Sequence, residues 1–184
     1  MPDLVQALSQ TFDHTAEVVG RVRPEDLDKP TPCPDWDVRA LLAHFAGVVV
    51  NMGRGAAGEG LLAPDDAFPV GNDLAGRFRA EAERTLAAWK AHGLEGEVDV
   101  GAGPMPASVA ISVNLVDTST HTWDLARATG QPEELPDDVA ATALDVAGGF
   151  VPHVREVVGI DPPVPVPDDA SPTAKLVAYM GRHP

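Results

Sequence analysis

Residues 37–50, DVRALLAHFAGVVV, decide the fold class of this chain. Their apolar side chains recur at steps of three and four, the spacing of one face of an amphipathic helix. Asp37 stands where an N-cap residue is expected, so the helix is predicted to begin there and to run to the glycines at 53–60. His44 lies at the edge of the apolar face.

The rest of the chain follows the same helical pattern. Helices are predicted from about Leu4 to Gly20, Asn72 to His92, Pro106 to Gly130, Asp137 to Val158 and Pro172 to Gly181. Prolines mark the long connections, which include RPEDLDKPTPCPDW at 23–36 and DPPVPVPDD at 161–169. No stretch shows strand alternation, although EVDVGAGPMP at 97–106 has room for a short extended piece. The sequence therefore predicts an all-α helical bundle that forms a single domain over residues 1–184.

The charge balance excludes several kinds of partner. Thirteen basic residues stand against 28 acidic ones, a net charge of -15, which would repel a phosphate backbone and an anionic membrane surface. No run approaches membrane-spanning length, and the first residues do not resemble a secretory signal. Cys33 is the only cysteine, so no internal disulfide can form. We therefore expect a cytoplasmic protein without nucleic-acid or membrane partners.

Three side chains have the pattern of a metal site. Asp117 and His121 are four residues apart, so they project from the same face of one helix, and His44 in the earlier helix can complete the set. Two imidazoles and one carboxylate leave coordination positions free, as in catalytic rather than structural sites. Zinc suits these ligands best, and nickel, iron(II) or manganese(II) can use them too. The alternative is an ordinary ion pair between Asp117 and His121.

Asp124 lies on the same helix face, one turn beyond His121. It is predicted to accept a hydrogen bond from that imidazole and so to orient a metal ligand. The alternative is an ion pair with Arg127 or Arg39.

Three further residues have a functional interpretation and a simpler one. Cys33 is either a reactive thiol or a small buried apolar residue, and the second role is more usual. His14 is expected to be an exposed surface histidine, with a proton donor as the alternative. Trp36 is predicted to be a packing residue, although one of the tryptophans could line a pocket.

Two phrases, TPCPDWDVRALLAHFAG at 31–47 and NLVDTSTHTWDLARATGQP at 114–132, together resemble the DinB-like superfamily. More narrowly, they resemble the metal-binding domain of mycothiol-dependent maleylpyruvate isomerase and its small actinobacterial relatives. The resemblance extends to the closing AKLVAYMGRHP and implies a four-helix bundle, here with additional C-terminal helices. It also implies that the metal is held at the positions of His44, Asp117 and His121. The isomerase has glutamate at the position of Asp117, whereas related small proteins accept aspartate.

The resemblance implies a class of chemistry rather than one reaction. Relatives use low-molecular-weight thiols such as mycothiol or bacillithiol, so a thiol transfer or thiol-assisted isomerisation of a small molecule is expected. The isomerase has a second, C-terminal domain for which 184 residues leave no room, so maleylpyruvate isomerisation itself is not carried over. The residues alone equally allow metal-assisted hydrolysis. A non-catalytic metal or ligand sensor, with the bundle serving as a homodimer scaffold, is the alternative from another class.

Overall fold

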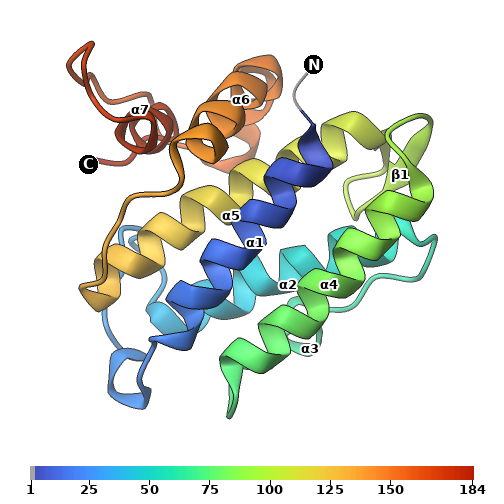
Figure 1. Ribbon diagram of the computed structural model, residues 1–184, viewed down its shortest axis with the longest axis horizontal. Coiled ribbons are helices and arrows are strands. Elements are labelled where there is room, and N and C mark those ends of the chain that lie inside the picture. Colours follow the sequence, from blue (N-terminus) through green and yellow to red (C-terminus); the bar gives the residue numbers. More distant parts are fainter. Residues whose placement is uncertain (1–2) are drawn as a thin grey trace.

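Four long helices form the bundle in the computed structural model, which describes residues 3–184. They are α1 (Leu4–Gly20), α2 (Val38–Ala56), α4 (Leu74–His92) and α5 (Ala107–Thr129). α1 and α2 each pack against both α4 and α5, so the apolar faces of all four helices meet in one core (Figure 1). This arrangement confirms the predicted all-α, DinB-like fold class.

Two further helices cover one side of this bundle. α6 (Asp137–Val158) packs against α5 and α1, and α7 (Pro172–Tyr179) packs against α6 and touches α5. Figure 1 shows both, in orange and red, on the same side as the C-terminus. The proline-rich segment between them, residues 161–171, contains no helix or strand. These are the additional C-terminal helices that the sequence indicated.

The helix ends lie where local chemistry sets them. Asp37 caps α2, since its carboxylate accepts a hydrogen bond from the backbone N–H of Ala40 at 2.8 Å. Gly130 ends α5 in the left-handed region, with φ of 69°, where glycine has no Cβ penalty. α4 begins at Leu74 rather than near Asn72, because Asp73 is its N-cap and accepts from the N–H of Gly76. The predicted boundaries are therefore correct to within about two residues.

Short elements occupy the connections. A 3₁₀ turn η1 (Pro24–Asp26) lies before α2, and the four-residue helix α3 (Pro64–Ala67) follows it. The sequence predicted only a loop at α3, because a single turn is too short to show apolar periodicity. The strands β1 (Glu97–Asp99) and β2 (Pro104–Pro106) pair antiparallel, with Val98 opposite Met105. They are the short extended piece for which the sequence left room.

α2 and α4 approach each other closely at one glycine. A Cβ atom on Gly53 would stand 2.8 Å from the Cα of Thr85, so no larger residue fits without moving a helix. The hydroxyl of Thr85 donates to the carbonyl of Val49 on α2 at 2.9 Å. This contact fixes the position of α2, the helix that contains His44.

α5 is buried along most of its length although its sequence is rich in polar residues. Several of its hydroxyl side chains donate within the helix: Thr120 donates to the carbonyl of Val116, and Thr122 to that of Thr118, both at 2.7 Å. These bonds remove most of the cost of burying those hydroxyls. The hydroxyl of Ser119 is an exception, because it is buried without a partner among the described residues. α5 also carries the fully buried Asp124, whose partners are described below.

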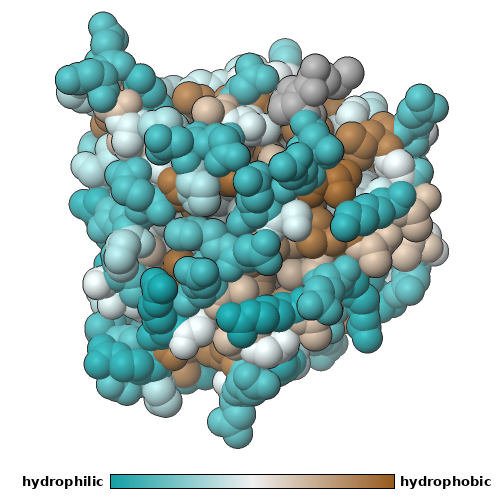
Figure 2. Space-filling view, viewed as in Figure 1, coloured by the Kyte–Doolittle hydropathy of each residue, from teal (hydrophilic) through white to brown (hydrophobic). Residues whose placement is uncertain are grey.

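Hydrophilic side chains cover most of the face shown in Figure 2, with smaller apolar areas between them. This distribution agrees with the acidic composition of the chain. Within residues 3–184, none of the helices combines the length and the apolar character needed to cross a membrane.

Candidate metal centre

Three side chains from α2 and α5 meet where these helices pack together. Nε2 of His44 and Nε2 of His121 each lie 3.6 Å from Oδ1 of Asp117. The two imidazole centroids are 5.1 Å apart, and the rings are nearly perpendicular, at 85°. One ligand atom from each residue lies within 4.8 Å of the other two. The structure thus brings together the three residues that the sequence singles out.

The carboxylate of Asp117 is poorly satisfied by its protein surroundings. Its Oδ1 is within ion-pair range of both imidazoles, but 3.6 Å is too long for a hydrogen bond. Its Oδ2 is buried and has no hydrogen-bond partner among the described residues. A buried carboxylate oxygen without a partner costs free energy, and a cation held by Asp117 and the two imidazoles would reduce that cost. The donor set fits a divalent metal ion better than the simple ion pair between Asp117 and His121.

The group is more open on one side than on the other. The side chains of His44, Asp117 and His121 are 35%, 21% and 10% exposed. Exposure therefore increases toward α2, while the His121 side is enclosed by the core. A small molecule would reach the three ligand atoms from the His44 side.

Two aromatic rings border the group. The indole of Trp36 lies 4.3 Å from the His44 ring and 5.7 Å from the His121 ring, centroid to centroid. Its loop is held by the hydroxyl of Thr31, which donates to the carbonyl of Trp36 at 2.8 Å. The ring of Phe45 stacks at 6.5 Å from that of His121. Trp36 is half-buried and restricts the orientation of His44, so it both packs and lines the group.

Asp124 holds the other nitrogen of His121. Its Oδ2 lies 2.9 Å from Nδ1 of His121, and its side chain is completely buried. Burial pushes the pKa of Asp124 upward, but hydrogen bonds from His121 and Arg182 outweigh it and keep the pKa below its usual value. An ionised carboxylate can only accept, so the network assigns the proton to Nδ1 and leaves the lone pair of Nε2 toward Asp117. This is the tautomer that a metal ligand requires.

The partner of Asp124 is not one that the sequence suggested. Arg182 donates to Asp124 from the end of the chain, through Nη2 at 2.9 Å and Nε at 3.3 Å. An ion pair of Asp124 with Arg127 or Arg39 is wrong, because these two arginines lie against other acidic residues. Arg182 is 58 positions from Asp124. No local spacing could have indicated the contact.

Cys33 completes the enclosed side. Its Sγ lies 3.4 Å from Oδ2 of Asp124, 3.4 Å from Nη2 of Arg182 and 3.9 Å from Nδ1 of His121. Burial, followed by the charge of Asp124, raises the pKa of the thiol to about 12, so the thiol keeps its proton. Cys33, His121 and Asp124 are close enough to form a second ligand group. The guanidinium of Arg182 already neutralises Asp124 there, so the group at His44 suits a cation better.

His14 is half-buried on α1 rather than exposed, and burial lowers its pKa. The expectation of an exposed surface histidine is therefore wrong.

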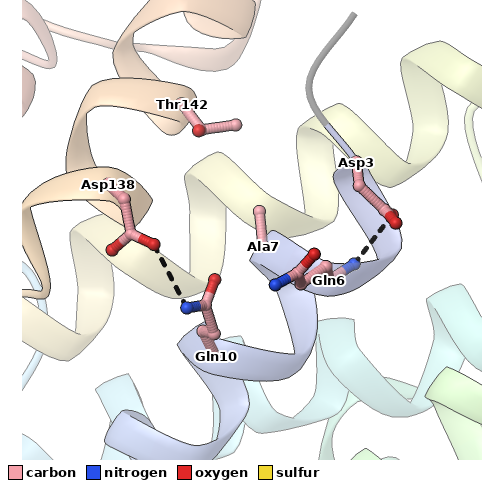
Figure 3. Close-up of a pocket in the computed structure, with 6 residues that line it drawn as sticks. All are labelled: Asp3, Gln6, Ala7, Gln10, Asp138 and Thr142. Carbon is pink, nitrogen blue, oxygen red and sulfur yellow. Dashed lines mark hydrogen bonds between the residues drawn. The ribbon is translucent and has the colours of Figure 1, made fainter.

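Two surface hollows of the described chain lie away from these residues. One, of about 170 Å³, lies between α1 and α6, where Nε2 of Gln10 donates to Asp138 at 3.1 Å (Figure 3). Another, of about 300 Å³, lies between η1 and the start of α4. Neither is lined by a residue of the ligand group. The more exposed side of the ligand group, next to His44 and Trp36, is therefore the approach that the side-chain exposures favour.

Fold and site together define a helical-bundle protein with a candidate metal-ligand group of two histidines and an aspartate. The chain belongs to the family described as mycothiol maleylpyruvate isomerase N-terminal domain, whose model matches residues 8–126. That region contains all three residues of the group. Membership of this family implies a metal-binding domain, which agrees with the candidate ligand group.

Two relatives match the chain over nearly its full length. They are uncharacterized proteins of Mycobacterium tuberculosis, from the strains CDC 1551 and ATCC 25618. Each is 32% identical over 185 residues, covering 98% of this chain and 98% of the relative. No solved structure matches. The similarity therefore extends beyond the matched domain to α6, α7 and the C-terminal segment.

Proposed function

We propose that this protein is a metal-dependent enzyme that uses a low-molecular-weight thiol, of the mycothiol type, in a transfer or isomerisation reaction on a small molecule. The observation that supports it most is the set of three ligand atoms within 4.8 Å, one of them on a carboxylate whose other oxygen is buried without a partner. Membership of a family of mycothiol-related metal-binding domains supports the thiol.

His44, Asp117 and His121 would hold the cation, and zinc is the ion we propose on ligand type. When bound, a divalent cation at these residues lowers the pKa of a thiol and polarises a carbonyl group. Three protein ligands leave positions for co-substrate and substrate. The chain's own part is to fix these ligands and to present one open side.

The surrounding residues would orient the ligands and shape the space around them. Asp124 keeps the proton of His121 on Nδ1, so that Nε2 remains available as a ligand. Trp36 packs beside His44 on the open side and would give a flat apolar wall to an entering molecule. Phe45 packs on the His121 ring and limits water from the core side.

Metal content tests the first part of this proposal. Protein purified without an affinity tag is analysed by mass spectrometry for bound metals, together with His44→Ala and Asp117→Ala. We expect about one equivalent of metal in the wild type and little in either variant, because each removes a ligand. The control is His153→Ala, an exposed histidine on α6, which should keep the metal. Equal metal in all four proteins would contradict the site.

Thiol binding tests the second part. The metal-loaded protein is heated with mycothiol, bacillithiol, glutathione or cysteine, and the unfolding temperature is compared with that of the metal-free protein. A thiol that binds the native metal-loaded state raises Tm, and the rise grows with thiol concentration. We expect the rise only with metal present. A loaded protein that responds to no thiol would favour a hydrolase or a metal sensor instead.

A further inference from the structure

The C-terminal segment reaches into the centre of the molecule at one point. Arg182 follows α7, and its backbone N–H donates to the carbonyl of Val177 at 2.9 Å. Its side chain is only 15% exposed and ends against Asp124, which has no exposure at all. Its Nη1 donates to the carbonyl of Met180 at 2.8 Å. The guanidinium is thus fixed from both sides.

The contact between Arg182 and Asp124 uses both carboxylate oxygens. Nε lies 3.3 Å from Oδ1 and Nη2 lies 2.9 Å from Oδ2. A two-point contact between a planar guanidinium and a carboxylate fixes the plane of the carboxylate, which a single bond would not do. The same Oδ2 accepts from Nδ1 of His121 at 2.9 Å. The plane of the carboxylate therefore sets the orientation of the imidazole.

Resting on the proposed metal function, we propose that Arg182 is a positioning residue: through Asp124 it keeps Nε2 of His121 directed at the ligand group with His44 and Asp117. The family match ends at residue 126, so it does not assign this role to Arg182. Without the guanidinium, Asp124 is free to rotate. The imidazole of His121 then loses its fixed acceptor.

The sign of the expected effect separates positioning from simple electrostatics. Arg182 is a positive charge near the centre, so removing it should strengthen cation binding if only charge mattered. Loss of an outer hydrogen-bond partner of a metal-ligating histidine instead weakens binding, by about 10- to 100-fold. A weaker affinity in an Arg182 variant therefore indicates positioning.

The experiment compares two arginines of the same region. Arg182→Met removes the two-point contact, and Arg155→Met is the matched control. Arg155 also ties the C-terminal segment, since it donates to the carbonyls of Tyr179 and Asp161, yet it contacts no residue of the centre. Zinc affinity is measured by calorimetry on metal-free protein, with helix content checked by circular dichroism. We expect at least a tenfold loss in Arg182→Met and little change in Arg155→Met.

A second readout does not depend on metal. In the metal-free protein the Nδ1 proton of His121 is held by Asp124 and should give a slowly exchanging NMR signal. We expect this signal in the wild type and in Arg155→Met, and its loss or broadening in Arg182→Met. Arg182→Lys keeps the charge but only one contact, so its zinc affinity should lie between those of the wild type and Arg182→Met.

Each negative result contradicts a different part of the proposal. A wild type that binds no zinc overturns the proposed function, and the positioning role with it. A wild type that binds zinc while Arg182→Met binds equally well overturns the positioning role alone. So does a weakened affinity with the Nδ1 signal intact. Should Arg182→Met not fold, Arg182→Lys decides, because an affinity equal to wild type would contradict the two-point contact.

Discussion

The two nitrogens of His121 face opposite kinds of surroundings. On the Nδ1 side, Asp124 is fully buried, and both of its oxygens accept hydrogen bonds. On the Nε2 side, Asp117 has one buried oxygen without a partner, and His44 is 35% exposed. Every carboxylate oxygen on the enclosed side has a hydrogen-bond partner, whereas Oδ2 of Asp117 on the open side has none. We infer that the first contributes stability to the fold and that the second provides capacity for a ligand.

The largest effect should come from breaking the enclosed side. Asp124→Ala removes the acceptor of Arg182 and leaves a guanidinium that is only 15% exposed without its partner. Removing one member of a buried ion pair costs about 3 kcal/mol or more. We expect a loss of this size in the free energy of unfolding of the metal-free protein, measured by urea denaturation.

A surface pair provides the control for that experiment. Glu133 and Arg127 form an ion pair whose side chains are 36% and 41% exposed. Glu133→Ala should therefore change the free energy of unfolding by less than about 1 kcal/mol. Equal losses in Asp124→Ala and Glu133→Ala would mean that the enclosed side is not a special source of stability.

A substitution on the open side should lower zinc affinity strongly and change the stability of the protein little. Asp117→Asn removes the one negative ligand, so zinc affinity should fall by more than the roughly 100-fold that loss of an outer partner can cost. The free energy of unfolding of the metal-free protein should change by less than about 1 kcal/mol, because Asp117 has no hydrogen bond to lose. Calorimetry and urea denaturation at pH 8 measure the two quantities. A large loss of stability with intact metal binding would reverse the comparison.

The sequence was sufficient to predict the fold because each long helix has an apolar period and end signals that can be recognised locally. The face formed by Leu41, Leu42 and Phe45 in α2 and the stop at Gly130 are readable from spacing and backbone preference alone. α3 is a single turn, too short to show an apolar period, so the sequence does not reveal it. β1 and β2 have three residues each, too few to show strand alternation.

The candidate centre likewise contains residues that local spacing predicts and residues that it does not. Asp117 and His121 are neighbours on one helix, so their spacing predicts their proximity. His44 is a candidate third ligand by residue type, and the resemblance to a metal-binding family supports that choice. Arg182 and Cys33 depend on how α7 and the loop before α2 fold onto α5. Such contacts are tertiary, and no period in the sequence encodes them.

Trp36 offers a smaller test that reports on the open side alone. Its ring lies 4.3 Å from that of His44, so zinc binding should change its fluorescence. Trp36→Phe should remove most of the zinc-dependent change. Trp123→Phe should retain it, because Trp123 is buried and lies against Arg127 instead. If the two variants respond alike, the zinc lies elsewhere.

The smallest effect on metal binding should come from Cys33, which borders the enclosed side. Burial and the charge of Asp124 raise the pKa of its thiol from 9.0 to about 12, so at pH 8 the thiolate is scarce. The native protein should react slowly with a disulfide reagent at pH 8 and rapidly once unfolded in guanidinium. Cys33→Ser should keep the zinc affinity of the wild type to within about threefold, since the cation is held on the other side of His121.

The same pKa determines how stability depends on alkaline pH. The folded state holds the thiol proton more tightly than the unfolded state, so the stabilisation is fully present below about pH 9 and is lost as pH rises toward 12. Wild type should therefore lose more stability than Cys33→Ser between pH 8 and pH 10.5, measured by urea denaturation. A fast reaction of native Cys33 at pH 8 would contradict the raised pKa of its thiol. Zinc binding abolished in Cys33→Ser would indicate that the cation binds on the enclosed side of His121.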